Sequence, residues 1–159
     1  MTSDENNLFE AFRADHATLG MGFHELSAAL RNNDLAMARK VVERLDTDAG
    51  AHIAFEEENF YKVLEPLVGA AEVEKMYREH EKGCEVMRTV VQSATLSEAE
   101  RNALLKKSEA MEEHIAECGD LFAAMGRLTA EEQEDLYQHL LAWRELAPRW
   151  TDFVAGQQH

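Results

Sequence analysis

Four of the seven histidines in this 159-residue chain have a spacing that could build a metal site. They are separated by 36, 28 and 34 residues, at His16, His52, His80 and His114. The midpoint of each interval falls on or beside a residue that interrupts helices, namely Asp34, Pro66 and Ser97. Proline lacks the amide proton that a helix needs, and short polar side chains compete for backbone partners. If the segments between these breaks are helices folded back on each other, all four imidazoles arrive at one level of one bundle.

His52 and Glu56 add a carboxylate to this layer. Residues four apart lie on one face of a helix, so both side chains can point at a common ion. One such pair alone is typical of a solvated face, but several buried histidines without partners are costly. We therefore predict a metal site in the bundle interior, where inward-facing His and Glu side chains build di-metal sites. The alternative is a metal-free helical interaction module whose histidine layer is structural.

The composition predicts an all-α protein, because strong helix formers dominate and only two prolines occur. Short loops make consecutive helices antiparallel, so we expect an up-down-up-down four-helix bundle. The expected helices span residues 3 or 4 to 31, 33 or 34 to 64, about 69 through 91, and 97 to 128. Residues 1–128 would form the bundle. Residues 129–159 would add a C-terminal helix that packs on or caps it within the same domain, interrupted by Pro148.

The net charge of −15 argues against a nucleic-acid partner, since phosphate binding needs a basic patch, and it disfavours anionic membrane surfaces. No apolar run approaches the ~20 residues of a membrane span, and residues 1–7 do not resemble a signal peptide. Two cysteines make no disulfide framework, which is typical of a reducing compartment. We expect a cytoplasmic protein with no nucleic-acid or membrane partner.

An internal repeat supports the metal site. Residues 52–60 and 114–122 share His, Ile, Ala and Phe at corresponding positions. His16 and His80 stand in the same relation one helix earlier in each half. The two helical hairpins therefore look like copies related by a pseudo-twofold axis, and the repetition preserves the histidines.

This arrangement resembles the haemerythrin-like, His-His-Glu (HHE) cation-binding family. The resemblance covers roughly residues 8–125 and lies in residues 15–19 (DHATL), 51–61 (AHIAFEEENFY) and 79–80 (EH). It implies a non-haem iron site, usually two irons bridged by carboxylates. The ligands that it implies are His16, His52, Glu56, His80 and His114. Zinc and manganese stay open, because imidazole and carboxylate serve these metals as well.

The chain departs from the family pattern at two sulfur-containing positions. The family expects a bridging Glu four residues after the fourth histidine, where this chain has Cys118. The oxygen-carrying branch places a carboxylate at the position of Gly119 and a further histidine at that of Cys84. Three explanations stay open: the thiols bind metal, Glu113 or Glu117 replaces the missing carboxylate, or the site holds one metal. We favour cysteines that pack in the core or beside the ligands, without a Cys84–Cys118 disulfide.

The incomplete ligand set makes oxygen transport the least expected role. We expect sensing of O2, NO or iron, or iron handling, at a di-iron or mono-iron centre, with di-iron preferred. Any signal would pass to a protein partner, for which the C-terminal helix is the candidate surface. We do not expect an enzyme, although a peroxidase-like or oxidase-like side activity at the iron is a third alternative.

Overall fold

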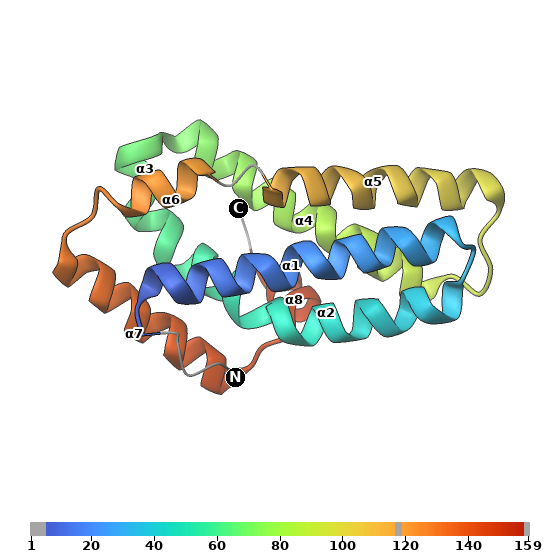
Figure 1. The fold of residues 1–159 in the computed structure, drawn as a ribbon, viewed down its shortest axis with the longest axis horizontal. Coiled ribbons are helices and arrows are strands. Elements are labelled where there is room, and N and C mark those ends of the chain that lie inside the picture. The colour runs from blue at the N-terminus through green and yellow to red at the C-terminus, as the bar shows by residue number, and fades with distance from the viewer. Residues whose placement is uncertain (1–5, 117–118, 158–159) are drawn as a thin grey trace.

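The computed structural model describes residues 6–116 and 119–157, and all regular structure in these ranges is helical. Four helical rods form the bundle, namely residues 8–31, 35–68, 70–92 and 98–116, and residues 130–146 and 150–155 add two shorter helices. The rods lie alongside one another (Figure 1). The elements are α1 (Leu8–Arg31), α2 (Leu35–Phe55), the π-turn η1 (Glu56–Phe60), α3 (Tyr61–Val68), α4 (Ala70–Gln92), α5 (Glu98–Ala116), α6 (Gly119–Met125), α7 (Ala130–Leu146) and α8 (Trp150–Ala155). The predicted all-α bundle with an additional C-terminal helix is confirmed. None of the described helices is long and apolar enough to cross a membrane.

The helix starts follow from capping side chains. Asp34 caps α2 by accepting a hydrogen bond from the Met37 amide, as predicted. Reciprocal capping boxes open α5 at Ser97 and α7 at Thr129. The first helix begins later than predicted, because the side chain of Asn7 accepts from the Glu10 amide while its own backbone is extended.

The turn between the second and third rods lies at Gly69 rather than Pro66. Pro66 lies inside α3, which ends two residues later at Val68, so the prediction of a break at the proline was wrong. The chain reverses at Gly69, whose φ of 96° is a left-handed conformation that glycine adopts without a steric penalty. A proline near the end of a helix removes one amide donor and does not reverse the chain by itself.

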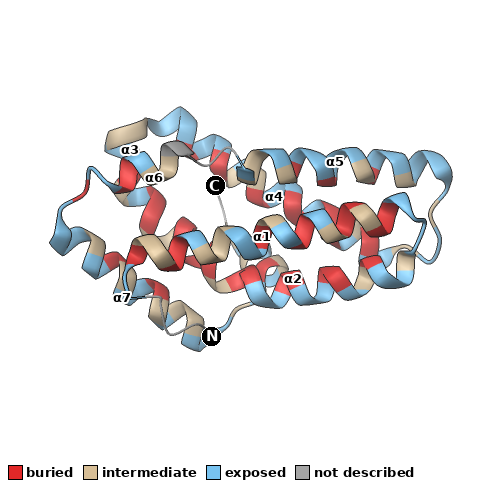
Figure 2. Ribbon diagram, viewed as in Figure 1, coloured by how far each residue is buried: buried red, intermediate tan, exposed pale blue. Residues whose placement is uncertain are grey.

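Buried residues occur along each of the four rods (Figure 2). They form two clusters, one around Phe23, Leu45 and Met87, and one around Phe12 and Phe60. α1 packs against α2 and α5, and α4 completes the ring by packing against the same two helices. The histidine-bearing segments are therefore neighbours around one core.

The C-terminal segment packs onto this ring. α7 contacts α1 and α2, and α8 contacts α2 and α4. Buried Asp46 on α2 accepts hydrogen bonds from the Arg149 guanidinium and from the amide and hydroxyl of Thr151. Between these two anchored residues, the Trp150 side chain is 1% exposed and contacts the core. We call residues 148–155 the C-terminal strap.

Gly50→Ala should destabilise the fold because the strap lies directly against this glycine. A Cβ on Gly50 would lie 1.7 Å from the Pro148 carbonyl oxygen, so backbone must move. We expect the free energy of unfolding to fall by about 3 kcal/mol, the upper end of the usual cost of overpacking. Urea unfolding measures the change.

Gly20→Ala is the matched control within a bundle helix. Its Cβ would meet only Ile115, at 3.7 Å, which is ordinary contact. Alanine in a helix interior is favoured over glycine by roughly 0.5–1 kcal/mol, so this variant should gain stability. A Gly50→Ala protein as stable as the parent would contradict the packing of the strap.

Candidate metal centre

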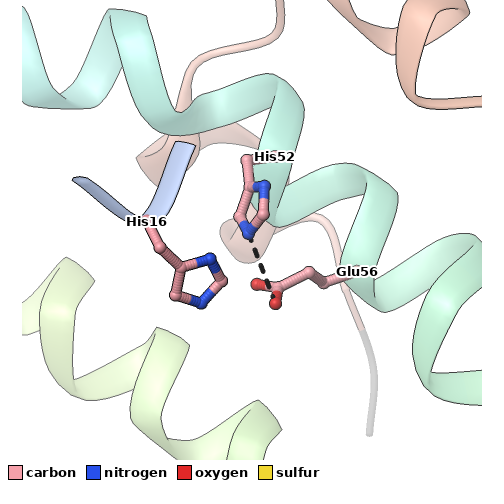
Figure 3. A group of neighbouring side chains, drawn as sticks. All are labelled: His16, His52 and Glu56. Carbon is pink, nitrogen blue, oxygen red and sulfur yellow. Dashed lines mark ion pairs between the residues drawn. The ribbon is translucent and has the colours of Figure 1, made fainter. Parts of the chain in front are cut away.

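Three of the predicted ligands meet where the middle of α1 lies beside the C-terminal end of α2 and the start of η1. One ligand atom from each of His16, His52 and Glu56 lies within 4.8 Å of the other two. Figure 3 shows both imidazoles beside the Glu56 carboxylate, with His52 and Glu56 one turn apart on the same rod. His52 and Glu56 are 2% and 3% exposed, so the group lies inside the bundle.

The three histidine rings share one hydrogen-bonding arrangement at Nδ1. In each, Nδ1 faces an oxygen that can only accept when carboxylates are ionised, so Nδ1 carries the proton. The N···O pairs are His16 with the Phe12 carbonyl (3.0 Å), His52 with Asp15 (2.9 Å) and His80 with Glu57 (2.6 Å). The neutral form of each ring then presents the Nε2 lone pair. Partners of this kind orient metal-binding histidines.

Glu56 lies between Nε2 of His52 and Nε2 of His80. Its Oε2 atom is 3.4 Å from Nε2 of His52, and its Oε1 atom is 3.1 Å from Nε2 of His80. Each carboxylate oxygen therefore faces a different imidazole, one on α2 and one on α4. The carboxylate has the position of a bridge between two groups of ligands.

The charges of the centre are tightly coupled. Burial would lower the pKa of His52, but the carboxylates of Glu56 and Asp15 outweigh it and raise the pKa to about 10. Burial likewise opposes a charge on His80, whose hydrogen bonds to Glu56 and Glu57 raise its pKa to about 9. Burial would raise the pKa of Glu56, but His52 and His80 hold it well below the usual range. Positive charge thus stabilises this carboxylate.

His16 differs from the other two rings. Burial and the neighbouring positive charge of His52 lower its pKa to about 4, so it is neutral at ordinary pH. Its ring lies edge-on to that of His52, with centroids 4.9 Å apart. A neutral imidazole is the form that binds a metal ion.

The donor set fits a metal ion. Buried Nε2 of His52 has no hydrogen-bond partner among the described residues, since its contact with Glu56 lacks hydrogen-bond geometry. An unpaired buried nitrogen is costly unless another group engages it. The carboxylates of Asp15, Glu56 and Glu57 also need positive charge nearby, which a metal cation supplies when it binds.

A cavity of about 170 Å³ adjoins the centre. His16, Glu56, His80 and His114 all line it, so the fourth predicted histidine reaches the same space from the last turn of α5. Apolar side chains make up much of the remaining wall: Leu19, Ile53, Met76, Met111, Ile115, Leu121 and Trp150. Tyr61 and the charged side chains of Glu72, Lys75 and Glu79 also line it, so the cavity has an apolar part and a charged part.

The additional candidates do not join this group of described residues. Cys84 is fully buried in the apolar core, with its Sγ atom 3.9 Å from the Trp150 carbonyl oxygen. Burial raises the pKa of the Cys84 thiol to about 12, whereas metals bind the thiolate. Glu113 is exposed and lines a separate surface hollow beside His114. Glu117 and Cys118 lie outside the described residues.

Sequence reasoning missed the residues that orient the histidines. Asp15 and Glu57 hold Nδ1 of His52 and His80, and Arg144 on α7 binds the second oxygen of Asp15 at 3.1 Å. Tyr61 places its hydroxyl 3.1 Å from Nε2 of His80. The signals were weak: Asp15 and Glu57 are each adjacent to a predicted ligand, and Arg144 lies 129 residues from its partner.

Asp15→Asn should weaken metal binding without removing a candidate ligand. The amide carries no charge to balance a cation and holds the His52 ring less firmly. Loss of such an outer partner typically costs about 10–100-fold in metal affinity, and we expect a decrease in that range. Competition for Fe²⁺ against a chelator of known affinity measures it.

Asp135→Asn is the matched control. Asp135 also neighbours a histidine, His139, at 3.7 Å, but on the exposed surface of α7. Its substitution should leave the metal affinity unchanged. Equal affinities for the Asp15→Asn and parent proteins would show that Asp15 does not support the centre.

The comparisons with known proteins identify the family. No curated protein and no solved structure gives a significant match to the chain. Residues 7–140, from the cap of α1 into α7, match the family described as the hemerythrin HHE cation binding domain. This match covers most of the chain and includes every candidate metal ligand, whereas Arg144 and the strap lie beyond it. The chain therefore belongs to the haemerythrin HHE cation-binding family.

Proposed function

We propose that this protein binds two iron ions in the bundle and responds to O2, NO or iron itself, rather than transporting oxygen. The position of Glu56 carries the proposal, because its two oxygens face Nε2 of His52 and Nε2 of His80 separately. A carboxylate placed between two imidazole groups suits a bridge between two ions.

The candidate ligands divide between the two sides of Glu56. His16 and His52 stand together on one side, and His80 stands on the other. His114 lines the same cavity as His80 and would supply the fourth imidazole. Iron accepts imidazole and carboxylate donors, and zinc and manganese compete for the same set, so supply also decides which metal is bound.

The cavity supports a small ligand. Its volume of about 170 Å³ leaves ample room for a diatomic molecule beside the metal site, since a cavity of about 150 Å³ can hold a molecule as large as benzene. When bound, iron would supply an open coordination position to such a molecule, while the apolar wall excludes bulk water.

Arg144 gives the proposed sensor a path to a protein partner. Its guanidinium binds Asp15, which in turn binds His52, so α7 connects to the centre through two charged contacts. A change of charge at the metal would alter the attraction between Asp15 and Arg144. We infer that the outer face of α7 is the surface on which a partner detects this change.

Metal counting tests the proposal. Untagged protein from iron-replete cells, prepared without chelator, should contain two irons per chain by elemental mass spectrometry, and its Mössbauer spectrum should show a coupled pair. One iron per chain would contradict the bridge. Absence of metal, together with an unaltered fold in a His52→Ala variant, would instead favour a metal-free interaction module.

A further inference from the structure

We propose that Tyr61 is an additional metal ligand, whose phenolate oxygen binds the ion on the His80 side of Glu56. The inference rests on the proposed iron centre and adds a residue to it. No motif in the chain marks this tyrosine as a ligand, and its position in the structure is the reason to consider it.

The Tyr61 hydroxyl lies against the donors on the His80 side of Glu56. Its oxygen is 3.1 Å from Nε2 of His80, the same nitrogen that lies 3.1 Å from Oε1 of Glu56. The Tyr61 side chain is 2% exposed and borders the cavity. A phenol oxygen, an imidazole nitrogen and a carboxylate oxygen therefore converge at one buried point.

Packing holds the ring in this place. The Tyr61 ring stacks on the His80 ring at an angle of 26°, with centroids 5.6 Å apart. Nδ1 of His80 is already bound by Glu57, so Nε2 and the phenol oxygen are the atoms that face the metal side. Few rotations are left to either ring, which favours a preorganised pair of ligands.

The π-turn explains how Tyr61 reaches this face. In an α-helix, five residues correspond to about 500° of rotation at 3.6 residues per turn, which would place Tyr61 about 140° away from Glu56. Here the Tyr61 amide bonds to the Glu56 carbonyl, closing an i to i+5 turn over η1. The wider turn brings Tyr61 round towards the Glu56 side. Such π-turns occur frequently at functional sites.

The chemistry suits a ferric ion. Phenolate is an anionic oxygen donor, and it would add an oxygen ligand beside the imidazole of His80 and the carboxylate of Glu56. On binding, the phenol O–H bond breaks, the oxygen–iron bond forms, and the proton leaves to a buffer base. No electron is transferred in this step.

Visible spectroscopy of ferric protein tests the inference. The protein is loaded with Fe²⁺ without oxygen and then oxidised with ferricyanide. We expect a phenolate-to-iron charge-transfer band, and resonance Raman spectra excited in that band should show tyrosinate ring vibrations. Tyr61→Phe keeps the packed ring and should lose both signals while retaining bound iron.

Tyr77→Phe is the matched control. The Tyr77 ring packs edge-on against Tyr61 at 5.4 Å, but its hydroxyl bonds to the Glu57 backbone carbonyl at 3.3 Å. This variant should keep the band. Parent protein grown with ring-deuterated tyrosine gives a second test that needs no substitution, since the Raman vibrations should shift.

The outcomes separate this inference from the proposed function. Bound iron without a charge-transfer band, or with a band that survives Tyr61→Phe, would overturn the tyrosine ligand and leave the iron centre standing. Protein that binds no iron would overturn both.

Discussion

Glu56→Gln is expected to lower the affinity for iron by more than about 100-fold. Loss of an outer partner costs about 10–100-fold, and the loss of a shared ligand should exceed that range. The amide of glutamine carries no negative charge with which to bridge two cations. The charges of His52 and His80, which keep the Glu56 carboxylate ionised, would also lose their partner. The iron content of the purified variant and chelator competition measure the effect.

Glu58→Gln is the control from the same run of three glutamates. Glu58 pairs with Lys62 at 3.6 Å near the surface, whereas Glu56 is buried. Glu58→Gln should retain parental iron content and stability. If Glu56→Gln also retained two irons per chain, the bridging role of this carboxylate would be refuted.

Trp150→Ala is expected to lower the free energy of unfolding by about 3–5 kcal/mol, the usual cost of truncating a buried aromatic side chain. The indole packs edge-on to Phe23, at 5.9 Å between centroids, and to the His80 ring at 6.4 Å. A Cβ on Gly83 would lie 2.6 Å from the Trp150 ring. The absence of a side chain at this position of α4 therefore makes room for the indole. Removal therefore leaves a void beside the centre.

Leu146→Ala controls for the loss of an apolar side chain near the strap. Leu146 is 71% exposed, and surface changes of this kind usually stay within about 0.5 kcal/mol. Thermal and urea unfolding of metal-free proteins should separate the two variants clearly. A Trp150→Ala protein within 1 kcal/mol of the parent would contradict the packing described here, on the scale of about 3–5 kcal/mol expected for such a truncation.

Local signals in the sequence were sufficient to predict most of the helices. Capping residues Asp34, Ser97 and Thr129 mark their starts because each satisfies amides within its own first turn. The error at Pro66 arose because a proline says little about where a chain reverses. The reversal depends on the left-handed backbone at Gly69, near which the third helix was correctly predicted to begin.

The spacing of the histidines predicted that they lie together, but it did not predict the carboxylates that hydrogen-bond to their rings. Asp15 and Glu57 act on rings from other helices, so their roles depend on how α1, α2 and α4 pack. Tyr61 was hidden for a different reason, since α-helical periodicity turns it away from Glu56 and only the π-turn reverses this. The spacing of residues along the sequence predicts which residues share a face of a regular α-helix. It does not reveal where a π-turn changes the rotation per residue.

The order of these elements along the chain has a consequence for synthesis. Every candidate ligand precedes Arg144 and Trp150, so a growing polypeptide completes its donor set before the residues that brace and cover it have emerged from the ribosome. Until then, the imidazoles meet solvent without the indole at their side. Enclosure of the candidate centre by the strap therefore follows the synthesis of all its candidate ligands.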